Sequence, residues 1–244
     1  MPNKKLHALI TGGSGAIGSH LAYALVAEGY HVTVAGRDEE SLKRVANNNP
    51  HISYQISDVT DPIETASLVA KTLPLDIAIL NAGAYQPGMT SQTTIDTFQH
   101  MMNVNFFGVV NCLPPLINHM KQHGGHIAIV GSLAGYVGLP NASGYGASKA
   151  AVVNLCESLQ AELQGSPVKI QLISPGFVKS KLTDKNDFHM PDLLEPEEAA
   201  QFIIKGLKSD KFEIAFPRRF CRKIKLLQLL PYKAYFSLIK KVVG

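Results

Sequence analysis

The chain has 244 residues, of which 45% are hydrophobic and only 17% are charged, and its formal net charge at pH 7 is +4. These values favour one compact domain and exclude a chain that is mainly disordered. Its three cysteines form no C-x-x-C pair, so we expect neither a disulfide framework nor a metal site. A cytoplasmic location is favoured, because thiols stay reduced there and no apolar run approaches the length of a membrane span, about 18 residues.

The basic residues are unevenly distributed. No acidic residue follows Glu213, whereas residues 217–244 contain eight bases: Arg218, Arg219, Arg222, Lys223, Lys225, Lys233, Lys240 and Lys241. The positive charge therefore belongs to the end of the chain. Nucleic acid is not expected as a partner, because the bases follow no recognisable nucleic-acid-binding motif.

Short aliphatic runs alternate with stretches of helical spacing along the chain. Strands are predicted at 7–10, 31–35, 52–56, 77–80, 126–130 and 169–173, with helices at 18–29 and 147–163 among the segments between them. This alternation predicts an α/β fold, a doubly wound parallel sheet of the Rossmann type covered on both faces. We expect one folded domain over residues 1–216 and a basic amphipathic helical extension over 217–244.

A glycine-rich segment, Thr11 to Gly18, follows the first predicted strand and opens a helix. Gly13, Gly15 and Gly18 match the pattern G-x-G-x-x-G, in which backbone amides and a helix N-terminus bind a pyrophosphate. An ordinary glycine-rich turn is the alternative. The second predicted strand ends in Gly36-Arg37-Asp38, where an arginine rather than an acid favours the 2′-phosphate of NADP. Alternatively, Arg37 is a solvated loop residue and Asp38 meets the ribose of NAD.

Tyr145 and Lys149 are four residues apart at the start of a predicted helix, so both can act on one site. Tyrosine and lysine on a helix are more often surface residues. Ser132 follows the fifth predicted strand, at the carboxyl end of the sheet where ligands bind in open α/β folds.

With these residues in place, the sequence resembles the classical short-chain dehydrogenase/reductase family over about residues 5–216. The resemblance rests on Thr11-Gly12 with Gly18, Asp58-Val59, Asn81-Ala82-Gly83, Val104-Asn105, Ser132, Tyr145-x-x-x-Lys149 and Pro175-Gly176. Two positions depart from the family pattern. Ala16 replaces the central loop glycine, with Gly15 beside it, and Leu80 replaces the first asparagine of Asn-Asn-Ala-Gly.

The resemblance implies four catalytic residues. Tyr145 would be the general acid in carbonyl reduction, Lys149 would favour its phenolate, and Ser132 would hydrogen-bond the substrate oxygen. Asn105 would position a water of a proton relay, or would only cap a buried turn.

The resemblance also implies a nicotinamide cofactor, and Arg37 at the end of the second predicted strand favours NADP over NAD. The expected cofactor-binding residues are Gly12, Ser14, Gly15, Ile17, Gly18, Arg37, Asp58, Val59, Asn81, Ala82, Gly83, Tyr145, Lys149, Pro175, Gly176 and Val178. Among them, Asp58 would bond the adenine amine, or would only form a turn before Asp61-Pro62.

Substrate selection would depend on residues 177–194. The apolar candidates are Met190, Leu193 and Leu194, with Leu133, Tyr136, Val137 and Asn141 nearby. They suggest a hydrophobic or acyl substrate, although the same residues could close the core.

Two amphipathic helices broken at Pro231 are predicted in the basic extension. Phe220, Ile224 and Leu227 share a face of the first, and Tyr232, Tyr235, Phe236, Ile239 and Val243 share a face of the second. The extension could contact an anionic membrane, cover the substrate pocket or a neighbouring subunit, or dock an acidic carrier protein.

The sequence thus predicts an NADPH-preferring oxidoreductase that interconverts a carbonyl and an alcohol on an apolar or acyl substrate, as a homodimer or homotetramer. Alternatives are a 3-oxoacyl-carrier-protein reductase within the family, a catalytically silent NADP-binding redox sensor, and a lipid-surface scaffold. The retention of Ser132, Tyr145 and Lys149 at the family spacing favours an enzyme.

Overall fold

The computed structural model describes residues 5–47 and 49–243, and side chains as far as residue 239. The side chains of Lys240, Lys241 and Val243, which the sequence analysis placed in the basic extension, lie outside the described residues. The strands are β1 (Leu6–Thr11), β2 (Tyr30–Gly36), β3 (Ile52–Ile56), β4 (Ile77–Leu80), β5 (Gly125–Val130), β6 (Val168–Pro175) and β7 (Glu213–Phe216). The α-helices are α1 (Ala16–Ala27), α2 (Glu39–Ala46), α3 (Pro62–Thr72), α4 (Ile95–Met102), α5 (Gly108–His123), α6 (Ser143–Glu162), α7 (Pro196–Leu207), α8 (Arg218–Gln228) and α9 (Tyr232–Val243).

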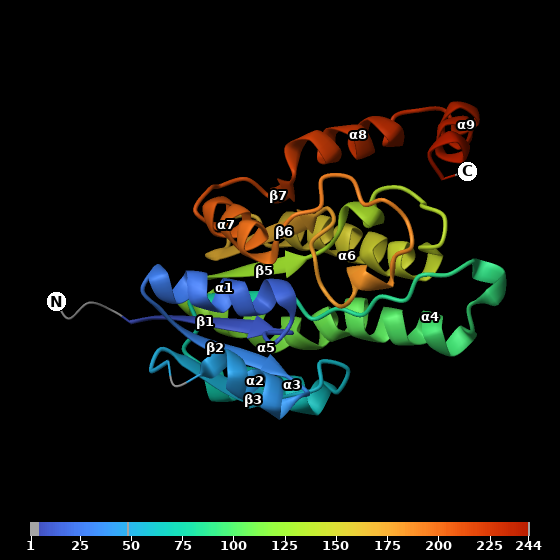
Figure 1. The fold of residues 1–244 in the computed structure, drawn as a ribbon. Helices are drawn as coiled ribbons and strands as arrows, with labels where there is room; N and C mark the ends of the chain where they lie inside the picture. Colours follow the sequence, from blue (N-terminus) through green and yellow to red (C-terminus); the bar gives the residue numbers. More distant parts are fainter. Residues whose placement is uncertain (1–4, 48, 244) are drawn as a thin grey trace.

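The seven strands form one parallel sheet in the order β3-β2-β1-β4-β5-β6-β7, between two layers of helices (Figure 1). Successive side chains of a strand point to opposite faces, so Ala8 and Ile10 of β1 pack with α1, α2 and α7, whereas Leu9 packs with α3, α5 and α6. All three side chains are fully buried. This arrangement confirms the predicted doubly wound Rossmann fold.

The strand order reverses between β1 and β4, which places a crevice beyond their carboxyl ends, where ligands bind in such sheets. The side chain of Asn81, directly after β4, ties the two ends together. Its amide donates to the carbonyl oxygens of Thr11 at 3.2 Å and Gly12 at 3.0 Å. The Thr11 hydroxyl in turn accepts from the backbone amides of Asn81 and Ala82. The glycine-rich loop is therefore fixed against the end of β4.

All six predicted strands are present, with ends that differ by at most two residues. The seventh strand, β7, was not predicted, because Glu213–Phe216 is a four-residue run that begins with an acid and alternates in burial. It pairs with β6 at the edge of the sheet, Leu172 with Glu213 and Pro175 with Phe216. Helix α6 begins at Ser143, four residues before its predicted start, and so includes Tyr145 in its first turn.

The basic extension forms the two predicted helices, α8 and α9, on either side of Pro231. They lie beside β7, at the edge of the molecule opposite β3 (Figure 1). Cys221 and Ile224 of α8 are buried against Leu133, so α8 packs on the segment that follows β5. The division into parts at residue 217 stays a prediction.

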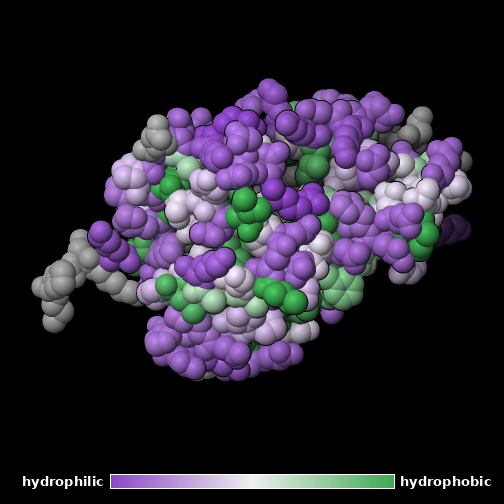
Figure 2. Space-filling model, turned by 90° about the horizontal axis from the view of Figure 1, so that it is seen from below, coloured by the Kyte–Doolittle hydropathy of each residue, from purple (hydrophilic) through white to green (hydrophobic). Residues whose placement is uncertain are grey.

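No helix in the described part of the chain is long and apolar enough to cross a bilayer. Figure 2 shows the face seen from below, where hydrophilic side chains cover most of the surface and apolar ones are scattered among them. Large exposed apolar side chains also occur near the end of the chain, where Leu229, directly after α8, and Tyr232 of α9 are each 79% exposed.

Candidate active site

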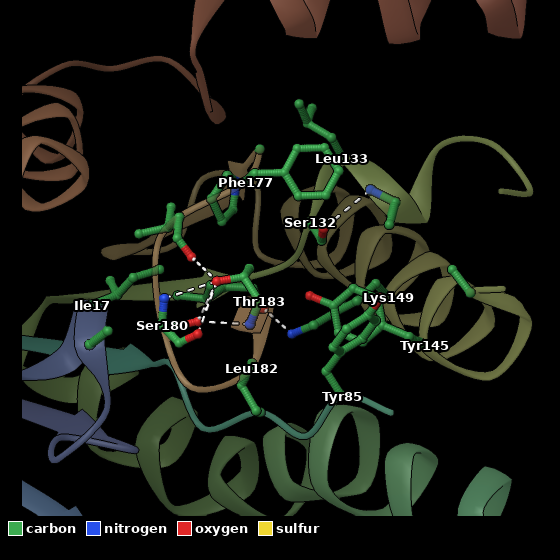
Figure 3. A pocket seen from close by; sticks show the side chains of 18 of the residues that line it. Ile17, Tyr85, Ser132, Leu133, Tyr145, Lys149, Phe177, Ser180, Leu182 and Thr183 are labelled. Atoms are coloured by element: carbon green, nitrogen blue, oxygen red, sulfur yellow. Dashed lines mark hydrogen bonds between the residues drawn. The ribbon is translucent and has the colours of Figure 1, made fainter. Parts of the chain in front are cut away.

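A cavity of about 1540 Å³ lies at the carboxyl ends of β1 to β6. Its lining joins the glycine-rich loop, the first turn of α6, the segment after β6, and residues of α8 and α9. Every site residue expected from the sequence lines this cavity except Gly18 and Asn105, which lie behind the lining. Figure 3 shows Tyr85, Tyr145 and Lys149 close together on one side of the pocket and Ile17 of the glycine-rich loop on the other.

The glycine-rich loop makes a tight turn that leaves no room for side chains at several positions, Gly12 and Gly18 among them. Gly12 has a φ of +63°, and a Cβ atom there would lie 2.7 Å from the Cα of Ala82. A Cβ on Gly18 would lie 2.4 Å from the Gly12 carbonyl oxygen. The amide of Gly15 donates to that same oxygen at 3.1 Å, and α1 begins at Ala16. The replacement of the family's central glycine by Ala16 thus leaves the turn and the helix start intact.

Arg37, at the end of β2, lies at the rim of the cavity. Its side chain is 66% exposed, and its guanidinium lies 3.8 Å from the carboxylate of Asp58. Gly36 leaves ordinary contact space there, because a Cβ would lie 3.7 Å from the Ser14 hydroxyl. The Asp38 carboxylate caps α2 by accepting from the amide of Ser41 at 2.6 Å, a bond that lowers the pKa of Asp38. Arg37 and Asp38 both line the cavity, but the Asp38 carboxylate is engaged in the helix cap.

Asp58 forms the turn before α3 and also lines the cavity. Its carboxylate accepts from the amide and hydroxyl of Thr60 at 2.9 and 2.8 Å. Partial burial raises the pKa of Asp58, but the Thr60 bonds and the positive Arg37 outweigh it, so the pKa lies below its usual value. Both interpretations of Asp58 weighed from the sequence are therefore compatible with its position.

Ser57, one residue earlier, supports the fit of an adenine nucleotide. It lines the cavity, is 2% exposed, and its hydroxyl has no hydrogen-bond partner among the described residues. A buried hydroxyl without a partner is costly in a folded protein. A nucleotide bound in this part of the cavity has the donors and acceptors to satisfy it. The tight glycine loop and this hydroxyl together indicate that the residues present fit a dinucleotide.

Tyr145, Lys149 and Ser132 converge beside the end of β5. Ser132 begins a 3-10 turn, Leu133–Gly135, by accepting from the amide of Ala134 at 3.1 Å. The Lys149 ammonium donates to the carbonyl oxygen of Val130 at 2.8 Å and lies 5.9 Å from the centroid of the Tyr145 ring. One side chain that follows β5 and two from α6 therefore lie close together in the lining of the cavity.

The surroundings of these side chains shift two pKa values. Burial raises the pKa of the Tyr145 phenol, and a hydrogen bond with Ser132 opposes that rise. Burial also lowers the pKa of Lys149 to about 8. Lys149 is only 3% exposed, so its charge is held in a region that disfavours it.

Asn105 lies in a π-helical turn, Asn103–Phe107, between α4 and α5. It is fully buried, and its amide donates to the Ala84 carbonyl oxygen and the Ser148 hydroxyl, both at 2.9 Å. Its side-chain oxygen accepts from the Ala84 amide at 2.7 Å. Asn105 thus fastens the segment after β4 to α6, which agrees with the capping alternative. Its role in a proton relay stays a prediction.

The segment after β6 crosses the cavity and contacts the segment after β4. The Tyr85 hydroxyl donates to the side-chain oxygen of Asn186 at 2.6 Å, and the Lys185 ammonium donates to the Tyr85 carbonyl oxygen at 2.8 Å. Tyr85 was not among the predicted site residues. It follows Asn81-Ala82-Gly83 by two positions, and an aromatic residue so near a cofactor motif was an available signal.

The apolar lining differs from the predicted one. Leu133 and Asn141 line the cavity, but Met190, Leu193, Leu194, Tyr136 and Val137 do not. Leu194 packs instead against the main core, and Tyr136 and Val137 pack beneath α8. The apolar lining comes from Phe177, Leu182 and Phe188 of the segment after β6, and from Phe220, Ile224, Leu227, Leu238 and Ile239 of α8 and α9.

A polar cluster joins α8 to the segment that begins at Ser132. The Tyr136 hydroxyl hydrogen-bonds the Glu213 carboxylate and lies 3.0 Å from the Ser174 hydroxyl. Glu213 also forms an ion pair with Lys225 of α8. Burial and the bond to Glu213 raise the pKa of Tyr136, so the phenol stays protonated. One cluster therefore links α8, β6, β7 and the turn that follows Ser132.

Comparison with known proteins identifies the class to which this fold and site belong. The family model for short chain dehydrogenase matches residues 6–190. The chain therefore belongs to the short-chain dehydrogenase/reductase family of oxidoreductases. It is 31% identical over 233 residues to an uncharacterized oxidoreductase of Myxococcus xanthus, with 92% of each chain covered. It is 32% identical over 181 residues to a 3-oxoacyl-[acyl-carrier-protein] reductase of Rickettsia bellii, with 73% of this chain and 75% of that protein covered.

Solved structures share the fold at low sequence identity. A short chain dehydrogenase from Burkholderia cenocepacia in complex with NADP has a TM-score of 0.87 at 23% identity, with 96% of this chain and 97% of that chain covered. A short chain dehydrogenase/reductase from Burkholderia phymatum in complex with NAD has a TM-score of 0.83 at 21% identity, with 91% and 92% covered. These neighbours establish the architecture over nearly the whole chain.

Proposed function

We propose that this oxidoreductase uses NADPH to reduce a carbonyl group to an alcohol on an apolar or acyl substrate, and catalyses the reverse reaction with NADP. The observation that carries the proposal is the convergence of Ser132, Tyr145 and Lys149 on a cavity that the glycine-rich loop also lines. A cofactor on the loop and a substrate beside Tyr145 could then occupy one continuous space.

Each of the three side chains has a task that its surroundings support. A bound nicotinamide cofactor supplies the reducing equivalent, and this chain's residues manage the proton. The Tyr145 phenol, kept protonated by burial, donates its proton to the substrate oxygen. The Ser132 hydroxyl hydrogen-bonds that oxygen and stabilises the charge developing on it. The Lys149 ammonium lowers the cost of the phenolate that remains and binds a ribose hydroxyl.

The proposed preference for NADPH over NADH rests on the rim of the cavity after β2. Arg37 offers a guanidinium to a 2′-phosphate, while Asp38 is engaged in capping α2. Ser14 and Gly36 leave space beside it. NAD stays the less favoured cofactor, since no acid at the end of β2 is free to bind both ribose hydroxyls.

The apolar lining supports a hydrophobic or acyl substrate. Phe177, Leu182 and Phe188 face a further apolar wall from α8 and α9, so a small sugar would leave much of this surface unpaired. Similarity to the Rickettsia bellii reductase favours a 3-oxoacyl thioester of a carrier protein as the second candidate. A free ketone or quinone and a carrier-bound thioester are therefore the two substrates to compare.

A catalytically silent redox sensor agrees less well with the site, because it has no need of the buried and destabilised charge of Lys149.

A homodimer or homotetramer is proposed as the assembly. Ile95 of α4 and Phe107, just before α5, are 68% and 48% exposed, and they offer apolar contacts for a second copy. The cytoplasmic location stays a prediction.

NADPH oxidation by the full chain, measured across apolar ketones, quinones and 3-oxoacyl thioesters, tests this function. Tyr145→Phe is expected to lower kcat about a hundredfold or more, while NADPH binding, followed by fluorescence, stays within about twofold. Tyr23→Phe, which alters an exposed tyrosine of α1, serves as the control and should be fully active. Turnover that survives in Tyr145→Phe, or no turnover by the native chain on any of these classes, would contradict the proposal.

A further inference from the structure

Helix α8 has two faces with different surroundings. Phe220, Ile224 and Leu227 line the cavity on its inner face. Arg219, Arg222, Leu226 and Leu229 follow each other at helical spacing on its outer side, and all four are exposed. Leu226 is 63% exposed and Leu229 is 79% exposed. The apolar inner face accounts for the packing of α8 on the enzyme. It does not account for the exposed leucines and arginines of the outer face.

Helix α9 continues the exposed apolar surface of α8. Tyr232 and Phe236 are one turn apart, and their rings stack at 5.9 Å with exposures of 79% and 62%. Tyr235, between them in sequence, points inward, where its hydroxyl hydrogen-bonds the Gly138 carbonyl oxygen. It is only 7% exposed. One aromatic side chain thus anchors α9 to the enzyme while its two neighbours face outward.

The bases of the extension surround these apolar side chains without acidic neighbours in sequence. Arg218, Arg219, Arg222 and Lys233 are exposed, and none of them forms an ion pair in the described part of the chain. Lys223 is exposed too, but it lines the cavity. Lys225 differs, because it pairs with Glu213. The outer face of α8 and α9 therefore combines aliphatic and aromatic side chains with unneutralised positive charge.

We infer that the outer face, formed by Arg219, Arg222, Leu226, Leu229, Tyr232 and Phe236, docks on the surface of an anionic lipid bilayer. The apolar side chains would enter the boundary between headgroups and acyl chains, the tyrosine hydroxyl would stay at headgroup level, and the bases would meet lipid phosphates. Positive charge without acids complements such a surface.

A second copy of this chain is a poorer occupant of the outer face. In a twofold dimer each residue of the patch faces the same kind of patch on its partner. Arg219 and Arg222 would then oppose bases, because no acidic residue follows Glu213 to compensate them. Like charges placed together in this way disfavour the contact. An acidic protein partner would also neutralise these bases, but it would bind the outer face in the absence of lipid.

Docking on lipid deepens the proposed function, on which this step rests, because it names the source of the apolar substrate. Leu238 and Ile239 of α9 line the cavity, and Leu238 is also 44% exposed. Because Leu238 both lines the cavity and is exposed to solvent, the cavity opens next to the docking face. A carbonyl compound dissolved in the bilayer could then enter without crossing water.

Sedimentation of the full chain with vesicles tests the docking face. We expect binding to phosphatidylcholine vesicles that contain phosphatidylserine, and weaker binding to vesicles of phosphatidylcholine alone. Arg219→Glu with Arg222→Glu should weaken binding to the vesicles about tenfold or more. Added salt should also weaken the binding of the native chain, because it screens the attraction to lipid phosphates. Leu229→Gln with Phe236→Gln should also weaken binding, since it removes buried apolar area.

Matched controls come from the far side of the molecule. Ile63→Gln alters a side chain that is 79% exposed, as Leu229 is, and Lys121→Glu reverses an exposed charge on α5. Both should bind vesicles like the native chain. Circular dichroism and NADPH turnover on a water-soluble ketone, measured without vesicles, should stay unchanged in all variants, which separates failed docking from failure of the proposed enzyme.

Three results would overturn the inference. They are equal binding to both kinds of vesicle, equal losses in the docking and control variants, and binding to an acidic carrier protein in place of vesicles.

Discussion

The ring of Tyr85 meets the ring of Tyr145 edge-on, with 4.9 Å between their centroids and 79° between their planes. Through its hydroxyl, Tyr85 also holds Asn186 of the segment that covers the cavity. One side chain therefore contacts both the proposed acid and the cover of the site. Sub-ångström placement of a reacting group affects rate strongly, so this contact bears on catalysis.

Tyr85→Phe should separate these two contacts, because it keeps the ring and removes the hydroxyl. We expect a several-fold rise in KM with little change in kcat, since the covering segment loses its bond through Asn186 while Tyr145 keeps its neighbour. Tyr85→Ala should lower kcat as well. Steady-state kinetics on the best substrate measure both, and a Tyr85→Phe enzyme with native KM would show that the bond does not hold the cover.

Arg37→Asp should reverse the cofactor preference. The change removes a partner of the 2′-phosphate and adds a negative charge near it, and together these are worth about 2 kcal/mol or more. The ratio of kcat/KM for NADPH to that for NADH should fall about thirtyfold or more, the same energy expressed as a rate ratio. Lys121→Asp on α5 is the control. An unchanged ratio would mean that Arg37 does not reach the phosphate.

Lys149→Met should stabilise the cofactor-free protein while removing activity. The native fold holds a buried ammonium whose pKa is lowered to about 8, and the cost at pH 7 is about 3 kcal/mol. The lost bond to the Val130 carbonyl oxygen offsets part of this gain. A rise of several degrees in Tm is expected at pH 7, with Lys71→Met on α3 unchanged. A lower Tm would contradict the assigned burial cost.

The same variant should show a pH dependence of known sign. Between about pH 8 and the ordinary lysine pKa, the unfolded chain keeps a proton on Lys149 that the folded chain has lost. The free energy of unfolding of the native protein therefore rises with pH in this window. The stability advantage of Lys149→Met should be largest at pH 7 and shrink toward pH 10. Thermal melts at several pH values measure the difference.

Tyr136→Phe should reveal the link between α8 and the turn after Ser132. It removes the hydroxyl that bonds Glu213 and Ser174, and leaves the carboxylate with Lys225 as its remaining partner in the cluster. We expect a loss of about 1–3 kcal/mol in the free energy of unfolding, measured by denaturant titration. Tyr54→Phe removes another tyrosine–glutamate bond, an exposed one to Glu39, and should cost much less. Equal losses would argue against a special role for the cluster.

Much of this molecule could be predicted because its signals are local. The strands are runs of buried aliphatic residues, and Gly12 and Gly18 are required by a turn that admits no Cβ. The positions of Tyr145 and Lys149 follow from helical spacing and from the family motif. These patterns depend on neighbours in sequence, so the sequence alone suffices to place them.

The missed features depend on distant contacts. β7 begins with an acidic residue, unlike the predicted strands, and it becomes a strand by pairing with β6. The apolar wall that α8 and α9 give to the cavity depends on where the extension folds back, which no local pattern fixes. Tyr136 and Val137 were predicted to lie near the pocket, but α8 covers them. Two of the alternatives left open for the extension, covering the pocket and contacting a membrane, involve opposite faces of the same helices: the inner face lines the cavity, and the outer face is the one proposed to dock on lipid.

The inward turn of Tyr235 has a consequence for how the cavity can vary. Its bond to the Gly138 carbonyl oxygen joins positions 97 residues apart in sequence, and Leu238 and Ile239, which follow it, complete one wall of the cavity. That wall therefore depends on an anchor far along the chain from the glycine-rich loop. Substitutions at Tyr235 could reshape the apolar wall while the turn at Gly12 and Gly18 keeps its conformation.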